Sequence, residues 1–169
     1  MISQNLIEKL ENLFSTEIVL TNNENMPVTC ISNGSISDDN LELFNKDFKI
    51  KLPKDYLNFL KRFNGCTIFN YENLAGFKLL GTENLRNSNL NQEEIYEDLW
   101  DESIIVFCEE FGSGDFISFR NQDDGSYEIL DCCHDDLPKD WAVISNSFND
   151  FLEKLIDFKG RPYWLYNNE

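Results

Sequence analysis

Apolar residues recur at helical spacing in three segments of the chain. Over residues 6–14 they fall at i, i+1, i+4, i+7 and i+8, which predicts an amphipathic helix. A second stripe, mostly aromatic, predicts a helix over 53–64, since Pro53 suits the first helical position and Asn64-Gly65 supplies a left-handed stop. A third stripe predicts a closing helix over 147–159. We interpret all three stripes as faces of a hydrophobic core.

The middle of the chain instead shows short apolar runs separated by turn residues, a pattern typical of strands. These runs predict strands at residues 77–80, 104–108, 116–119, 127–130 and 141–144. The third and fourth of them are expected to form a hairpin across 121–126. The sequence also predicts an acidic helix over 91–100 with Glu94 completing a capping box, a short helix after Ser37, and an edge strand within 28–31.

This order of elements indicates the α+β class. We expect a single domain over residues 1–169, with a central mixed, mainly antiparallel sheet and flanking helices in the N-terminal half and at the C-terminus. The sequence has no apolar run of membrane-spanning length and no cationic start followed by an apolar core, so neither a membrane span nor a signal peptide is predicted. Its five cysteines are irregularly spaced, which fits a reducing compartment and predicts a cytoplasmic protein.

Charge limits the partners that such a domain can have. Lys and Arg number 14 against 31 Asp and Glu, a formal net charge of −17. Direct binding to nucleic acid is disfavoured, because phosphate backbones require a basic surface. A hydrophobic content of 41% is too high for a disordered acidic tail. Either solubility or a protein partner with a basic surface would explain the charge, and with such a partner complementary fields would accelerate association. The sequence leaves the oligomeric state open.

Catalytic chemistry has few candidate residues. His134 is the one histidine, so any mechanism that activates a nucleophile with an imidazole base must use it. It follows Cys132 and Cys133, but adjacent cysteines lack the two-residue spacing that brings two thiolates to one zinc ion. We therefore predict no metal site, no cofactor and no enzymatic activity. An enzyme using His134 with Cys132, Cys133 or Asp135 stays open as an alternative.

The acidic residues themselves are the remaining candidates for a functional site. Any one of them can be simply a solvated surface charge. As a group they are the candidate contacts for a basic partner: Glu93, Glu94, Glu97, Asp98, Asp101, Glu102, Glu109, Glu110, Asp115, Asp123 and Asp124.

Several short motifs, in their order and spacing, resemble the SUKH superfamily. They are Leu-Glu-Leu-Phe at 41–44, Leu-Pro-Lys-Asp-Tyr-Leu-Asn-Phe-Leu at 52–60, Asn-Gly at 64–65, Gly-Phe-Lys-Leu-Leu-Gly at 76–81, Ile-Val-Phe at 105–107, Gly-Ser-Gly-Asp-Phe-Ile at 112–117, Tyr127, and Ser-Phe-Asn-Asp-Phe-Leu at 147–152. The similar region covers residues 37–158. It leaves an N-terminal extension with one amphipathic helix, 1–36, and an aromatic tail, 159–169.

The resemblance implies an α+β fold and a role in binding. Bacterial members of the superfamily are mostly immunity proteins that neutralise a toxin, often one directed at nucleic acid, and fungal members include regulators of cell-wall synthesis. We therefore expect an immunity protein that binds a cognate toxin in the cytosol without catalysis. The alternative is a regulatory interaction module of the fungal kind, for which the aromatic residues 163–166 would offer an anchor unless they pack against the domain.

Overall fold

The computed structural model describes residues 1–15, 20–48 and 51–166 of the chain. Its helices are α1 (Gln4–Phe14), α2 (Asp38–Asp47), α3 (Lys54–Phe63), α4 (Thr82–Tyr96) and α5 (Phe148–Asp157). Its strands are β1 (Leu20–Thr21), β2 (Pro27–Ser32), β3 (Cys66–Tyr71), β4 (Ala75–Leu79), β5 (Ile104–Glu110), β6 (Phe116–Asn121), β7 (Tyr127–Cys132) and β8 (Ala142–Ser145). Short 3₁₀ turns follow at Glu97–Leu99, Pro138–Asp140 and Tyr163–Leu165.

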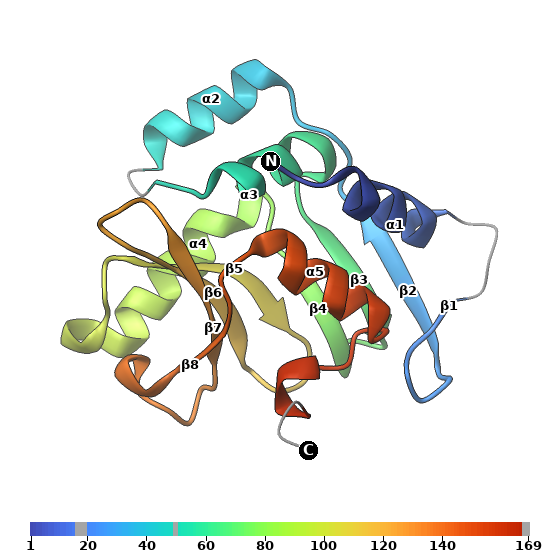
Figure 1. Cartoon of the computed structure of the whole chain (residues 1–169). Coiled ribbons are helices and arrows are strands. Elements are labelled where there is room, and N and C mark those ends of the chain that lie inside the picture. Colours follow the sequence, from blue (N-terminus) through green and yellow to red (C-terminus); the bar gives the residue numbers. More distant parts are fainter. Residues whose placement is uncertain (16–19, 49–50, 167–169) are drawn as a thin grey trace.

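The strands form one sheet in which each pairs with its neighbour in sequence, in the order β1 to β8. All of these pairings are antiparallel, so the expected mainly antiparallel character is confirmed, whereas the described strands include no parallel pair that would make the sheet mixed. Helices pack around the sheet (Figure 1), which confirms the α+β class and the predicted hairpin of β6 and β7. Because consecutive strands run in opposite directions, successive turns lie at opposite ends of the sheet.

Aromatic side chains fill the space between the sheet and helices α3 and α5. The Tyr56 ring on α3 packs, with centroid distances of 5.6, 5.3 and 5.4 Å, against Phe107, Phe119 and Phe148. Its hydroxyl donates to the Leu80 carbonyl at 2.6 Å, so the one polar atom of this buried ring is satisfied. The aromatic stripe of the predicted helix over 53–64 is therefore a core face, as expected.

Helix α1 packs beside α5 and on β2 (Figure 1). Leu6 and Leu10 are fully buried in the core that the sheet also lines. Ser3 caps the helix by accepting from the Leu6 backbone N–H at 3.0 Å, and its hydroxyl donates to Glu153 on α5 at 2.7 Å. The N-terminal segment is thus tied to the closing helix by apolar burial and hydrogen bonds.

The acidic helix differs from its predicted extent of 91–100. Helix α4 begins at Thr82 and ends at Tyr96, so the proposed capping box around Glu94 is wrong because this residue lies inside the helix. Its buried positions are Leu85 and Asn89, four residues apart, and both lie before the predicted start at residue 91. A helix with one apolar and one polar residue on its buried face gives almost no periodic signal.

Strand β3 is absent from the expected elements. Its residues do not alternate between buried and exposed, and Phe69 has a left-handed backbone with φ of 51°. The pairing of β3 with β4 changes register between Ile68 and Tyr71 at this point. A bulge of this kind breaks the two-residue period by which a strand is recognised.

Asn89 connects α4 to the sheet where β4 has ended. The pairing of β4 with β5 reaches only from Phe77 to Leu79, so Val106 has no partner strand on that side. The Asn89 side chain takes its place: Nδ2 donates to the Val106 carbonyl at 2.9 Å, and Oδ1 accepts from the Val106 N–H at 2.8 Å. Nδ2 also donates to the Leu85 carbonyl at 2.7 Å.

Replacing Asn89 with Ala should destabilise the fold strongly. The substitution leaves the buried Val106 N–H and C=O unsatisfied, at a cost of about 2–4 kcal/mol in the free energy of unfolding. Urea unfolding measures this difference. The matched control is Asn87→Ala on the exposed side of the same helix, which should change stability by no more than about 0.5 kcal/mol. Equal effects of the two substitutions would contradict the role of Asn89.

Candidate functional site

The candidate acidic residues fall into three groups in the structure. Six follow the end of α4 and the loop to β5, and we call them the acidic strip: Glu93, Glu94, Glu97, Asp98, Asp101 and Glu102. A second group lies where β5 turns into β6: Glu109, Glu110 and Asp115. A third lies in the turn between β6 and β7, at the other end of the sheet: Asp123 and Asp124. The single list from the sequence is therefore not one surface.

The acidic strip is held on the sheet by aromatic packing. Tyr96 and Trp100 contact the Trp141 ring at 5.3 and 6.2 Å, and Trp141 packs on Phe116 of β6 at 5.2 Å. After Trp100 the loop to β5 passes the end of β6, where the Asn121 N–H donates to the Ser103 carbonyl at 2.9 Å. This contact places the end of the strip at the same end of the sheet as the β6–β7 turn.

All six carboxylates of the acidic strip are exposed. Among the residues that the structure describes, none of the six forms an ion pair. Two large apolar side chains are exposed between them, Ile95 at 67% and Leu99 at 58%. A hollow of about 680 Å³ borders the strip, and Leu90, Glu93, Trp100 and Glu102 line it together with the basic residues Lys51 and Arg86. The strip thus combines free negative charge with apolar surface.

The carboxylates at the β5–β6 turn are paired, hydrogen-bonded or partly buried within the molecule. Glu109 pairs with Lys78 at 3.1 Å and accepts from the Ser88 hydroxyl at 2.5 Å. Asp115 accepts from His134. Glu110 is half-buried, and burial, with smaller contributions from Asp115 and Asp131, raises the pKa of its carboxyl group to about 7. These groups offer less free charge to a partner than the acidic strip does.

The two aspartates of the β6–β7 turn are exposed. Asp124 accepts hydrogen bonds from the Ser126 hydroxyl at 2.6 Å and the Ser126 N–H at 2.9 Å, and these bonds lower its pKa. Gly125 beside it has a φ of 85°, as a tight hairpin connection needs. The turn chemistry expected here is confirmed, and Asp123 remains an exposed charge near the end of the strip.

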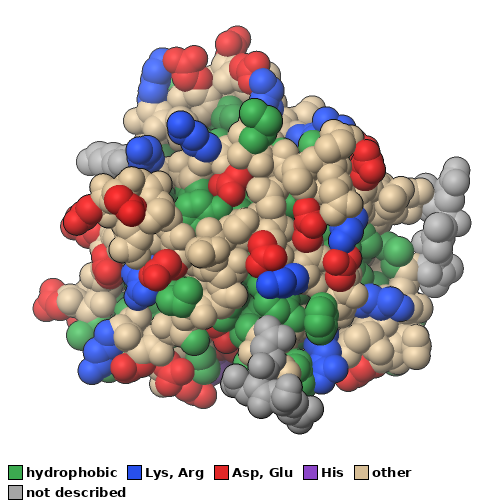
Figure 2. All heavy atoms as spheres, viewed as in Figure 1, with side chains coloured by type: hydrophobic (Ala, Val, Ile, Leu, Met, Phe, Trp, Pro, Cys, Tyr) green, Lys and Arg blue, Asp and Glu red, His purple; other side chains and the backbone are tan. Residues whose placement is uncertain are grey.

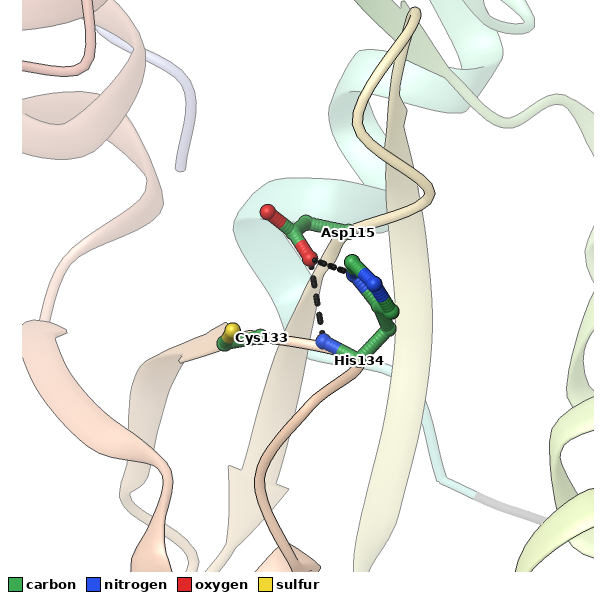
Figure 3. A group of neighbouring side chains, drawn as sticks. All are labelled: Asp115, Cys133 and His134. Carbon is green, nitrogen blue, oxygen red and sulfur yellow. Dashed lines mark hydrogen bonds and ion pairs between the residues drawn. The ribbon is translucent and has the colours of Figure 1, made fainter.

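His134 lies beside Asp115 rather than in a nucleophilic pair with Cys132. The carboxylate Oδ1 of Asp115 is 2.7 Å from the His134 Nδ1 and accepts from the His134 backbone N–H at 2.9 Å (Figure 3). This hydrogen bond and the charge of Asp135 raise the pKa of the imidazole. One nitrogen of His134, a carboxylate oxygen of Asp115 and the Cys133 sulfur all lie within 4.8 Å of one another.

The adjacent cysteines occupy different environments. Cys132 ends β7 and is fully buried, and burial raises the pKa of its thiol, which leaves it protonated and poorly nucleophilic. Cys133 lies just beyond the strand and is partly exposed. Only Cys133 joins the group around His134, a distinction that the sequence alone does not make.

The aromatic tail packs against the domain. Tyr163 is 2% exposed. Trp164 contacts Phe77 at 6.2 Å and Phe151 at 5.9 Å between ring centroids. The packing role considered for residues 163–166 is therefore confirmed for Tyr163 and Trp164, and these two rings are not free to anchor a partner.

Figure 2 shows the face of the molecule over α5, where acidic and basic side chains alternate. Ion pairs explain part of this mixture, such as Lys9 with Asp157 and Lys154 with Asp150. The excess negative charge of the chain is therefore not gathered on this face. In the described part of the chain, no helix is long and apolar enough to cross a membrane.

An antiparallel sheet packed against helices, with a strip of exposed carboxylates beside it, defines an α+β domain. The model of the SMI1 / KNR4 family (SUKH-1) matches residues 35–154, more than half of the chain, and the chain belongs to this family. The match confirms the resemblance to the SUKH superfamily. No curated protein matches the sequence. Helix α1 and strands β1 and β2 lie before the matched region, although α1 and β2 contribute to the same core.

The raised pKa of Glu110 predicts a pH-dependent stability. The folded chain holds this proton up to about pH 7, whereas the unfolded chain loses it near 4.5. Folding therefore binds a proton in this window, and the glutamate lowers stability as the pH rises through it. We expect the free energy of unfolding of Glu110→Gln, relative to that of the wild type, to rise by on the order of 1–2 kcal/mol between pH 4 and 8, allowing for solvent screening. Urea unfolding across this range checks it, and a constant difference would contradict it.

Proposed function

We propose that this protein is an immunity protein, which binds a cognate toxin in the cytoplasm and neutralises it without catalysis. Family membership supports a place among proteins with such a role. The observation that carries the proposal is the acidic strip, where six exposed carboxylates lack ion-pair partners among the described residues. Self-repulsion among these charges costs stability, and a basic partner relieves it.

The chemistry of the strip suits a toxin directed at nucleic acid. Such a toxin needs a basic cleft for the phosphate backbone of its substrate. A row of carboxylates from Glu93 to Glu102 presents negative charge to that cleft as phosphates do. Binding there would exclude the substrate by occupying its site, and a protein–protein contact of this kind requires no catalytic residue on the inhibitor.

The apolar residues of the strip can supply binding affinity that charge alone does not. Electrostatic complementarity mainly raises the association rate, whereas buried apolar anchors dominate affinity. Ile95 and Leu99 are exposed among the carboxylates, and the hollow beside Trp100 can receive a partner side chain. An interface of standard size, roughly 800 Å² on each partner, is large enough to include both kinds of contact.

Co-expression tests the proposal directly. The probe is the product of the coding sequence immediately upstream of this gene, because immunity genes of such systems usually follow their toxin genes. We expect cells that express this product alone to stop growing, and cells that also express the full-length protein to grow normally. Continued killing in the presence of abundant soluble protein would overturn the proposal.

Neutralising the acidic strip should weaken binding to that toxin. The variant Glu93→Gln, Glu94→Gln, Glu97→Gln and Asp98→Asn removes four negative charges. We expect at least a 10-fold lower association rate at low salt, and a shallower decline of the rate with rising ionic strength than in the wild type. Stopped-flow or surface plasmon resonance measures both quantities.

The matched control removes the same net charge elsewhere. Glu8→Gln, Glu24→Gln, Asp39→Asn and Glu72→Gln change four exposed carboxylates on α1, α2 and the turns before β2 and β4. We expect this control to keep most of the association rate. If both variants lose binding equally, overall charge and not the acidic strip is responsible.

A further inference from the structure

We propose that Asp115, Cys133 and His134 form a zinc-binding site at the open end of the β6–β7 hairpin, opposite its turn. This site is not predicted from the sequence. The three residues offer a carboxylate oxygen, a thiol sulfur and an imidazole nitrogen, all within 4.8 Å of one another. Carboxylate, thiolate and imidazole are the three ligand types that proteins use for zinc. The inference does not depend on the proposed immunity function.

The register of the hairpin brings the ligands together. Phe116 pairs with Cys132 as the last pair of the β6–β7 ladder. The next position outward sets Asp115 opposite Cys133, and directly opposed residues in an antiparallel pair have neighbouring side chains. Figure 3 shows Asp115 reaching from the start of β6 towards the residues that follow β7. Ligands 18 positions apart in sequence are thus held on adjoining strand ends.

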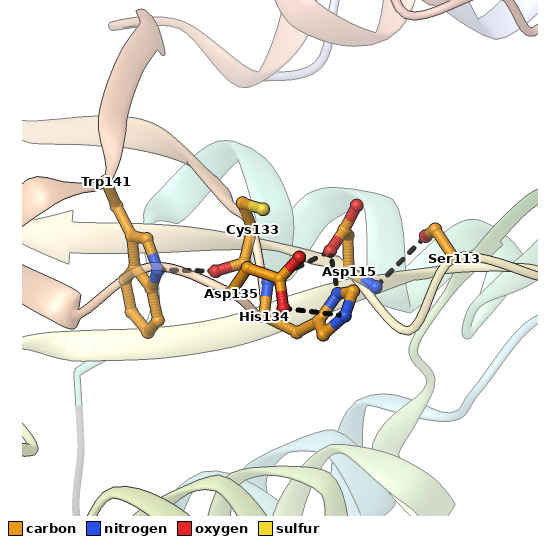
Figure 4. A network of polar contacts seen from close by, with 6 residues as sticks. All are labelled: Ser113, Asp115, Cys133, His134, Asp135 and Trp141. Carbon is orange, nitrogen blue, oxygen red and sulfur yellow. Dashed lines mark hydrogen bonds and ion pairs between the residues drawn. The ribbon is translucent and has the colours of Figure 1, made fainter.

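The backbone around the site is fixed by hydrogen bonds (Figure 4). The Cys133 carbonyl accepts from the Trp141 indole N–H at 3.1 Å and from the Asp136 N–H at 3.0 Å. On the opposing strand, the Asp115 N–H donates to the Ser113 hydroxyl at 3.0 Å. The two ligand-bearing segments are therefore anchored before any metal binds, which reduces the entropy that binding must overcome.

The geometry fits zinc with a small movement. Ligand atoms around a tetrahedral zinc lie about 3.3–3.7 Å apart, so the widest separation would close by about 1 Å. The exposed His134 ring has room to make this adjustment. Binding would replace the hydrogen bond between His134 and Asp115 with two bonds to the metal. Nδ1 would give up the proton that it donates to Asp115, to Nε2 in a neutral imidazole or to solvent in an imidazolium, and the Cys133 thiol would release its proton to solvent. Three protein ligands leave the fourth position to water.

A neighbouring carboxylate completes the arrangement. The Asp135 Oδ1 lies 3.4 Å from the His134 Nε2, while Nδ1 faces Asp115 (Figure 4). If Nδ1 binds zinc, Nε2–H can donate to Asp135, a common outer contact of metal-bound histidine that fixes the ring.

Metal titration of the reduced, metal-free full-length protein tests the site. With Zn²⁺ in calorimetry we expect one ion bound per chain. With Co²⁺ we expect the near-ultraviolet absorption of a cobalt–thiolate bond. Cys133→Ser and His134→Ala should each weaken Zn²⁺ binding at least 10-fold, and Cys133→Ser should also abolish the cobalt–thiolate band. Asp135→Asn should weaken Zn²⁺ binding about 10-fold, as loss of an outer contact does.

The control is Cys30→Ser, which removes another partly exposed thiol, on β2. It should leave both the stoichiometry and the affinity unchanged, and circular dichroism of each variant verifies the fold. The proposal is overturned if the wild type binds no stoichiometric Zn²⁺, or if Cys133→Ser and His134→Ala bind it as the wild type does. Loss of the site in Cys30→Ser would also overturn it.

Discussion

The pairing of β6 with β5 and β7 is the constraint on which most of this structure depends. Its register places Phe119 on the face covered by α3 and α5, where it stacks on Phe107 at 4.0 Å. Residues of a strand alternate between faces, so Phe116 lies on the opposite side and receives Trp141. A slip of one residue would exchange these faces and bring Ser118 into the aromatic core. Two packed layers therefore depend on one ladder of hydrogen bonds.

The same ladder sets the position of every candidate site. The β5–β6 turn and the loop after β7 lie together at one end, which brings Asp115 to His134. The β6–β7 turn and the loop before β5 lie at the other end, where Asn121 bonds to Ser103. Between these ends, the acidic strip follows the sheet because Tyr96 and Trp100 pack on Trp141. Core packing and surface chemistry are thus linked through a few aromatic side chains.

The elements with strong periodicity and end signals could be predicted from the sequence, and the pairing details could not. The helix over 53–64 has an aromatic stripe and a left-handed stop, which the structure places at Asn64 with φ of 43°. Helix α4 lacks such a stripe, because Asn89 takes a core position by hydrogen bonding to β5 instead of by apolar burial. Similarly, the left-handed Phe69 in β3 breaks the alternation that would have indicated a strand.

The candidate metal ligands illustrate how sensitive a site is to register. The sequence predicts a hairpin across 121–126 without fixing its register, and the structure pairs Asn121 with Tyr127. A shift of one residue in this register would move Asp115 away from its position opposite Cys133. Cys132 and Cys133 are adjacent in sequence, but side chains alternate between faces along the strand end. The Cys132 thiol therefore lies in the core, and the Cys133 thiol lies towards the surface.

The net charge of −17 acquires a more specific meaning from this arrangement. Basic residues neutralise carboxylates on the helices and the strand face, as in the pairs Lys78–Glu109 and Arg120–Glu128. Among the described residues, these basic side chains leave the whole acidic strip unpaired. The backbone of the strip is fixed by aromatic contacts. A flexible acidic tail would lose conformational entropy on binding, whereas a strip already held on the sheet loses less. Rigid placement, in addition to the amount of charge, therefore supports the proposal that this surface recognises a basic partner.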